Sequence, residues 1–158
     1  MQLQEAVADR WLNAILRTYP SQTARFFVTS KDPLRNPVGI AFKESLTTLI
    51  TELFHGMDAD RVSSALERVV AIRAVHDFSP RQALAFIFEL KEILREECPG
   101  PALEVYLPRI DEMALTAFDL YVKCREKICE LRASEDRRRV YVLERKLAAG
   151  AKQERGEN

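Results

Sequence analysis

The sequence contains few side chains that could carry out chemistry together. Its two histidines, His55 and His76, fall in different predicted helices, so a catalytic triad or zinc site would need partners from elsewhere in the fold. Phosphate-binding, zinc-protease, serine-hydrolase and CxxC motifs are absent. His55 adjoins Gly56 at a predicted helix end, where an imidazolium suits the negative end of the helix dipole. We therefore predict a protein that is not an enzyme and has no metal site and no cofactor.

Three other residues are candidates for contact with a ligand or partner. His76 extends the apolar face of a predicted helix over residues 58–77 by one turn, and Arg73 lies beside that face. Arg73 either forms a surface ion pair with Asp77, four residues on, or points into a pocket and binds an anionic ligand. Trp11, the only tryptophan, either packs in the core or forms a pocket wall. The candidate contacts are therefore Trp11, Arg73 and His76.

The three cysteines do not form an evident metal or disulfide framework. Cys98, Cys124 and Cys129 are few and odd in number. Cys124 and Cys129 are five residues apart in a helical pattern, which places them about 140° apart around the helix. One helix cannot direct both thiols at one metal ion. Structural thiols are the favoured interpretation, and a redox or metal role is the alternative.

Composition narrows the class of protein further. The chain has 158 residues, of which 47% are hydrophobic and 30% charged, as in globular domains. The 24 basic and 24 acidic side chains balance, which argues against a nucleic-acid binder. The basic run at residues 137–139 follows Glu135 and Asp136 and fits a solvated helix face better than an acidic docking partner. No apolar stretch predicts membrane insertion or a signal peptide, so we expect a cytoplasmic location.

Proline, glycine and capping residues divide the chain into helices, and no segment has the pattern of a strand. The predicted fold is all-α, a compact bundle of five to six helices with a long C-terminal helix. Ser21 is expected to cap a short second helix, Asn36-Pro37 to open the third, and Asp58 to cap the fourth. The expected helices cover about residues 3–18, 21–28, 37–55, 58–77, 80–97 and 108–148.

Two of these helices have informative faces. In the third, Phe42, Leu46 and Leu49 predict an inner face, whereas Glu44 and Glu52 fall on the polar face. The helix after Ser79-Pro80 carries an unbroken apolar run over residues 83–88, so we predict that it is central and that Phe88 is buried. Ser79 and Gln82 have the spacing of a capping box.

The longest helix is predicted to begin at Pro108. Its apolar residues recur three and four apart and suit packing on the domain or a two-stranded seam. The residues expected to form a dimer or docking surface are Tyr121, Cys124, Ile128 and Leu131. The stripe fails across residues 133–139 and resumes out of phase at Val140. We therefore expect a domain over residues 1–132 and a charged helical extension with a frayed end over 133–158.

Three segments resemble one known family. They are WLNAILRTYP (11–20), FFVTSKDPLRNPVGIAF (26–42) and IRAVHDFSPRQALAFIFELKEILREE (72–97). Together they resemble the N-terminal domain of RsbRD-type proteins, the RsbT co-antagonists, over about residues 5–130. The third segment is the most specific, because it combines a helix end, a Ser-Pro restart and an aromatic-rich helix in fixed order.

The resemblance implies an all-helical input domain of stress signalling that dimerises and precedes an output module such as a STAS domain or histidine kinase. It also implies a globin-like arrangement without haem. The sequence contains no STAS or kinase module, so we expect either a stand-alone sensor or adaptor whose output partner is another chain, or an interaction subunit that no longer senses a signal. The predicted function is a non-enzymatic sensor or adaptor that acts by dimerisation or by helix-mediated docking to a signalling protein. The alternative is a globin-like protein that binds haem or a metal.

Overall fold

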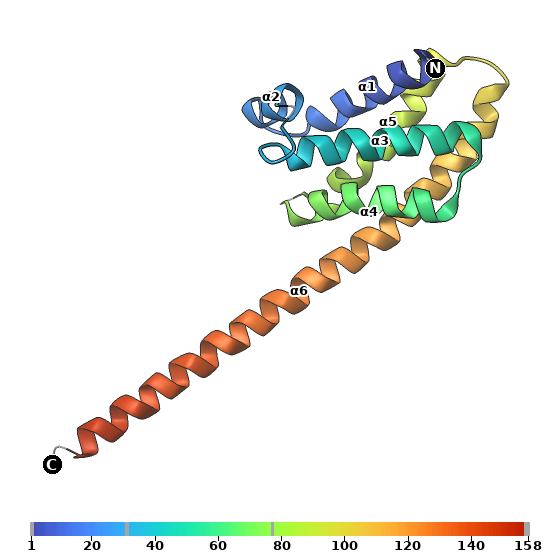
Figure 1. Cartoon of the computed structure of the whole chain (residues 1–158). Coiled ribbons are helices and arrows are strands. Elements are labelled where there is room, and N and C mark those ends of the chain that lie inside the picture. Colours follow the sequence, from blue (N-terminus) through green and yellow to red (C-terminus); the bar gives the residue numbers. More distant parts are fainter. Residues whose placement is uncertain (1, 31, 77, 157–158) are drawn as a thin grey trace. The chain divides into compact units, whose positions relative to one another are not determined.

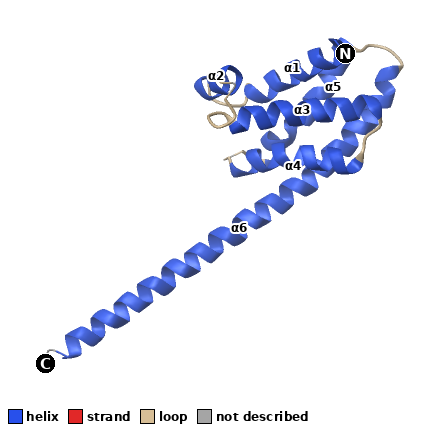
Figure 2. Ribbon diagram, in the orientation of Figure 1, coloured by secondary structure: helices blue, strands red, loops and turns tan. Residues whose placement is uncertain are grey.

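The computed structural model describes residues 2–30, 32–76 and 78–156, with side chains up to residue 150, and within these ranges it contains six helices and no strand (Figures 1 and 2). The predicted all-α fold with a long C-terminal helix is confirmed. The helices are α1 (Gln2–Leu16), α2 (Ser21–Thr29), α3 (Pro37–His55), α4 (Ala59–Val75), α5 (Pro80–Glu97) and α6 (Ala102–Gly156).

The contacts within the chain group into two units, Met1–Cys124 and Arg125–Asn158. The first unit, called here the body, contains α1 to α5 and the N-terminal part of α6. Within it α3 lies between α1 and α4 (Figure 1), and α5 packs against α1 and α4. The second unit, called here the tail helix, is the remainder of α6.

The core of the body is built from apolar stripes at helical spacing. α3 buries Phe42, Leu46 and Leu49, as predicted, and the face of α1 that carries Trp11 and Ile15 is also fully buried. α5 buries Phe86 and Ile87, but Phe88 is 52% exposed. The prediction that Phe88 lies in the core is therefore wrong, because this part of α5 has an exposed face despite its apolar sequence.

Local side-chain hydrogen bonds fix where two helices begin. Ser79 caps α5 by accepting from the amide of Gln82, whose own side chain accepts from the amide of Ser79, so the predicted capping box is present. Asn36 caps α3 by accepting from the amide of Gly39, and its Nδ2 donates to the carbonyls of Phe27 and Ser30 at 2.8 and 2.7 Å. These bonds satisfy amides that have no partner inside the helix.

Two expected helix starts are corrected. Ser21 is the first residue of α2 and makes no capping hydrogen bond, since Pro20 occupies the N-cap position. α6 begins at Ala102, so Pro108 lies inside it and does not start it. Proline has no amide hydrogen, and α6 therefore lacks one bond of its helical ladder at that point. Arg109 follows directly and donates to the carbonyl of Leu53 at 2.5 Å, which attaches α6 to the C-terminal end of α3.

Candidate functional site

The ring of Tyr19 is the meeting point of five segments of the body. It follows α1 and is almost fully buried. Aromatic rings surround it from α2, α3, the end of α4 and the start of α5, at centroid distances of 5.4 to 6.0 Å. With Arg73 these residues form what we call the Tyr19 cluster: Tyr19, Phe27, Phe42, Arg73, His76 and Phe78. A change in this cluster would affect the ends of several helices at once.

Arg73 lies on the inner side of the Tyr19 cluster. It is fully buried, and its guanidinium carbon lies 4.6 Å from the ring centroid of Phe78 and 5.7 Å from that of Tyr19. Its Nε and Nη2 donate to the carbonyls of Ala83 and Gln82 at 2.8 and 2.7 Å, and Nη1 donates to Thr18 Oγ1 at 3.1 Å. Burial lowers the pKa of the Arg73 guanidinium. Arg73 thus joins the end of α1, the end of α4 and the first turn of α5.

The two interpretations of Arg73 left open by the sequence can now be compared with its position. A surface ion pair does not fit a side chain with no exposed surface. Asp77, the proposed partner, lies outside the described residues. Arg73 has no exposed surface among the described residues, so a ligand on that surface would not touch its side chain.

His76 is the exposed member of the Tyr19 cluster. Its Nδ1 lies 3.5 Å from the hydroxyl oxygen of Tyr19, and the two rings meet edge to face at 83°. Burial raises the pKa of the Tyr19 hydroxyl, so this hydroxyl stays protonated at neutral pH. A ligand or partner that contacts the exposed ring of His76 would therefore act directly on the buried ring of Tyr19.

Trp11 lies in the core beside the Tyr19 cluster. It has no exposed surface, and its Nε1 donates to the carbonyl of Phe86 at 2.6 Å. The ring of Phe86 packs against Trp11 at 5.7 Å and against the guanidinium of Arg73 at 5.6 Å. The structure thus connects Trp11, Arg73 and His76 through Phe86 and Tyr19, with Trp11 and Arg73 fully buried and His76 exposed.

A shallow depression beside Tyr19 was not anticipated from the sequence. It has a volume of about 580 Å³, lies between α1 and α2, and is lined by Asn13, Leu16, Arg17, Tyr19, Ser21, Ala24, Arg25, Val28 and Thr29. Two of these side chains are arginines and none is acidic. The depression favours a ligand or partner group with negative charge next to an apolar part. Arg17 follows the end of α1 and Arg25 lies in α2, so the periodic pattern of one helix would not have revealed the depression.

The expected docking residues of α6 occupy different environments. Tyr121 is buried, and its hydroxyl donates a long hydrogen bond of 3.5 Å to the carbonyl of Phe78. Cys124 and Ile128 are half-buried, and Leu131 is 58% exposed. Tyr121 therefore links α6 to the Tyr19 cluster within the body, whereas Leu131 is open to a partner.

Comparison with known proteins identifies the family to which this chain belongs. The model of the RsbT co-antagonist protein rsbRD N-terminal domain matches residues 5–136. The chain belongs to this family. An uncharacterised protein of Archaeoglobus fulgidus is 25% identical over 135 residues, which is 84% of this chain and 83% of the relative. No solved structure matches, so the globin-like arrangement implied by the resemblance stays a prediction. Membership in the rsbRD N-terminal domain family indicates a regulatory domain of stress signalling.

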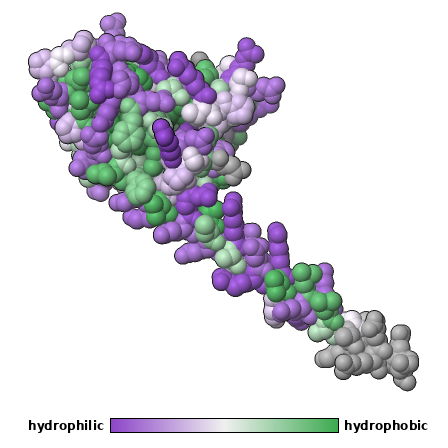
Figure 3. All heavy atoms as spheres, turned by 180° about the vertical axis from the view of Figure 1, so that it is seen from behind, coloured by the Kyte–Doolittle hydropathy of each residue, from purple (hydrophilic) through white to green (hydrophobic). Residues whose placement is uncertain are grey.

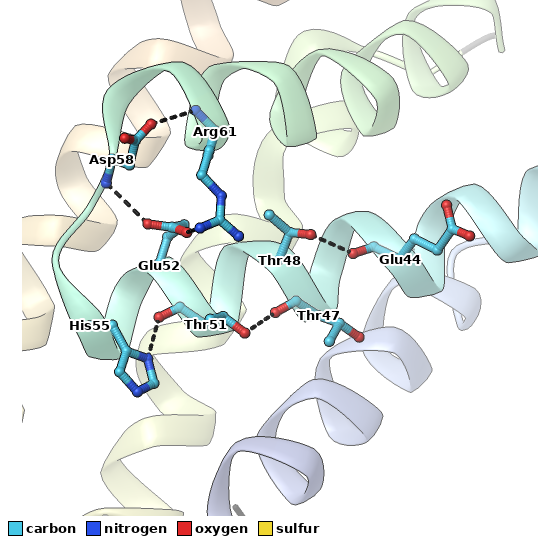
Figure 4. A network of polar contacts seen from close by, with 8 residues as sticks. All are labelled: Glu44, Thr47, Thr48, Thr51, Glu52, His55, Asp58 and Arg61. Carbon is cyan, nitrogen blue, oxygen red and sulfur yellow. Dashed lines mark hydrogen bonds and ion pairs between the residues drawn. The ribbon is translucent and has the colours of Figure 1, made fainter.

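A second polar network in this rsbRD-type domain is structural. Glu52, expected on the polar face of α3, is almost fully buried and accepts from the amide of Asp58 at 3.1 Å and from Arg61 at 2.8 Å (Figure 4). The threonines of α3 donate to carbonyls one turn back, and His55 Nδ1 lies 2.8 Å from the carbonyl of Thr51. The network stabilises the turn between α3 and α4, because Glu52, Asp58 and Arg61 bind one another across it.

The remaining candidates for chemistry are dispersed. Cys98, Cys124 and Cys129 form no disulfide with one another, and of the three only Cys129 is exposed. In the described part of the chain, no three His, Cys, Asp or Glu side chains come together in a way that could hold a metal ion. None of the described helices is apolar enough over a sufficient length to cross a membrane.

Proposed function

We propose that this protein is a non-enzymatic sensor or adaptor of stress signalling, in which the Tyr19 cluster responds to a ligand or partner and α6 passes the response on. The family match supports the regulatory role. The observation that carries the proposed route is the position of Phe78. Its ring contacts Tyr19 and Arg73, and its carbonyl accepts from Tyr121 of α6. A displacement of Phe78 would therefore act directly on α6.

We further propose that the output reaches a separate signalling chain, such as a STAS-domain protein or a kinase, through the tail helix. Leu131 is exposed and Ile128 half-buried, one turn apart. Apolar side chains at this spacing suit a helical partner or the same helix of a second copy. Docking at these residues leaves the core of the body intact, since none of them belongs to it.

The coupling between the Tyr19 cluster and α6 can be tested with the two histidines. Both lie exposed at helix ends, but only His76 touches Tyr19. We expect His76→Ala to change hydrogen–deuterium exchange in α6 around Tyr121, whereas His55→Ala leaves α6 unchanged. Equal exchange in α6 for the wild type and the His76→Ala variant would refute the coupling.

The docking role is tested by changing Ile128 and Leu131 together to glutamate. We expect loss of binding to a purified STAS domain, and of any dimer formed through these residues, with the circular dichroism of the body retained. Arg132→Glu, an exposed change beside Leu131, is the matched control. Retained binding in the double variant would exclude this stripe as the docking site, and outright unfolding would show that it is core.

A further inference from the structure

The segment from the middle of α1 to the end of α2 carries charge of one sign only. Residues 10–31 contain four basic side chains and no acidic one, in a chain whose 24 basic and 24 acidic side chains balance. Arg10 forms ion pairs with two glutamates of α5. The exposed guanidinium groups of Arg17 and Arg25 have no ion pair or hydrogen bond with another described residue. Two positive charges of this segment are therefore not compensated in the described part of the chain.

Arg17 and Arg25 both line the depression between α1 and α2, which has a volume of about 580 Å³. We call it the Tyr19 depression. Leu16 and Tyr19 line it as almost fully buried residues, whereas Arg17, Arg25 and Val28 are exposed. The depression therefore has an apolar base with two cations at its edge. Its volume is in the range of sites that bind small molecules.

The two helices beside the Tyr19 depression contribute no carboxylate to it. α2 contains no acidic residue. On α1 the nearest one, Asp9, lies eight residues before Arg17, about 12 Å along the helix axis, and lines a different depression together with Lys43. Asn13 and Ser21 add an amide and a hydroxyl to the lining, and neither side chain has a hydrogen-bond partner among the described residues. A bound group would therefore meet two cations and two neutral hydrogen-bonding groups.

The apolar face of the tail helix differs from the Tyr19 depression in its charge. Val140, Leu143 and Leu147 are exposed, and Figure 3 shows green side chains gathered there, next to the grey end of the chain. Helix phase places Asp136 on the same face and Arg139 at its edge. That face therefore favours neither sign of charge in a partner, whereas the Tyr19 depression favours an anion.

We propose that the Tyr19 depression binds a small organic phosphate monoester with a compact apolar group. A phosphate monoester carries about 1.5 to 2 negative charges at neutral pH and offers three acceptor oxygens. It therefore matches the guanidinium groups of Arg17 and Arg25 better than a carboxylate, which carries a single charge. The apolar group of the ester packs on Leu16 and Tyr19. The inference rests on the proposed function, because it names the class of ligand to which the Tyr19 cluster responds.

Such a ligand would fix α2 to the rest of the body. α2 has no buried residue, so few apolar contacts hold it in place. Arg17 follows α1 and Arg25 lies in α2, so a phosphate bound by both joins the two helices. The same ligand contacts the ring of Tyr19, which packs against Phe27 of α2 at 5.6 Å and against Phe42 of α3 at 6.0 Å. Binding should therefore slow hydrogen–deuterium exchange in α2.

The first experiment is an NMR titration of the full chain with phenyl phosphate. We expect the amide signals of Ser21 and Arg25 to shift. Phenyl sulfate, which has the same shape but one negative charge, and inorganic phosphate, which lacks the ring, should each bind at least about tenfold more weakly. Equal binding of the three anions, or shifts centred on the basic run at residues 137–139, would overturn the proposal. Tighter binding of a short phosphoserine peptide would assign the depression to a protein partner and would contradict a small-molecule site.

The second experiment compares matched variants in the same titration. Arg17→Gln and Arg25→Gln should each weaken the binding of phenyl phosphate by at least about tenfold, because each removes one cation. Arg81→Gln, at an exposed position of α5 outside the lining, should leave it unchanged. Val28→Asp should abolish binding by placing a carboxylate in the depression. Val105→Asp is its control, since Val28 and Val105 are 57% and 54% exposed. Equal weakening by a variant and its control would contradict the site.

Hydrogen–deuterium exchange with and without phenyl phosphate separates this inference from the proposed function. We expect slower exchange in α2 and a change in α6 around Tyr121. Binding with unchanged exchange in α6 would support the phosphate site and refute the coupling to α6. Absence of binding, in a chain whose α6 still responds to His76→Ala, would refute the phosphate site and leave the coupling intact.

Discussion

Phe86 and Phe88 are two residues apart on α5 and have opposite environments, with 1% of Phe86 and 52% of Phe88 exposed. Phe86 contacts both Trp11 and Arg73, whereas Phe88 lies beside Lys91. Two phenylalanines of the same helix therefore have different roles: Phe86 packs in the core, and Phe88 lies on the surface.

This pair gives the first prediction. Phe86→Ala should lower the free energy of unfolding by about 3–5 kcal/mol, because it leaves a cavity in the core. Phe88→Ala should change it by only about 0.5 kcal/mol, as at other surface sites. Urea unfolding followed by circular dichroism measures both. Comparable losses in the two variants would show that α5 is packed differently.

Ser79→Ala should destabilise the body by about 1 kcal/mol, the usual cost of a lost N-cap. The Ser79 hydroxyl accepts from the amide of Gln82 at the start of α5, and alanine leaves that amide without a partner. Ser64→Ala, at an exposed position inside α4, is the control and should be neutral or slightly stabilising. Thermal melts would detect the difference, and a neutral Ser79→Ala would argue against the capping box.

Gly39→Ala should cost about 1–3 kcal/mol because there is no room for a methyl group. A Cβ at Gly39 would lie 2.5 Å from the carbonyl oxygen of Phe27 and 2.5 Å from the side-chain nitrogen Nδ2 of Asn36. Gly150→Ala, where the Cβ would meet nothing within 4 Å, should instead raise helicity slightly. Chemical denaturation and circular dichroism test the two, and a tolerated Gly39→Ala would mean that α2 and α3 are less closely joined.

Alkaline pH should weaken the body through Tyr19. Burial raises the pKa of this hydroxyl above the usual tyrosine value of about 10, so the unfolded chain loses its proton first. The stabilisation is complete below that value and is lost as pH rises through the raised pKa. In Tyr19→Phe the stability should depend less on pH in this window, whereas Tyr141→Phe should behave as the wild type. Denaturation midpoints at several alkaline pH values give the comparison.

The protein should not bind haem. A globin-type site needs an axial ligand, usually histidine. His55 is exposed beside Thr51, and His76 is exposed against the edge of Tyr19. Protein produced with ample haem should therefore show no Soret band. A Soret band that disappears in His76→Ala would establish the haem-binding alternative.

Local chemistry made much of the fold predictable. Asn36-Pro37 and Ser79-Pro80 set the starts of α3 and α5, because the cap and the proline act within one turn of the chain. Features decided by distant partners were not predictable in this way. Glu52 has the spacing of a surface residue, yet Arg61 and the amide of Asp58 hold its carboxylate in a buried position.

In the candidate site, too, the sequence indicated individual residues but not the distant contacts that position them. The sequence indicated Arg73 and His76 as residues of interest, but each is defined by segments far away along the chain. Arg73 is held by Thr18 and by carbonyls of α5, and His76 is placed by Tyr19. The periodicity of a single helix does not indicate which distant residues contact it. The burial of Arg73 therefore could not be predicted from the sequence of α4 alone.

The position of Trp11 has a spectroscopic consequence. It is the only tryptophan, and it lies in α1, fully buried against Phe86 of α5. Its fluorescence therefore monitors the body alone, whereas circular dichroism records the tail helix as well. If the two units melt separately, the two signals will follow different transitions, and their difference isolates the melting of the tail helix without any label.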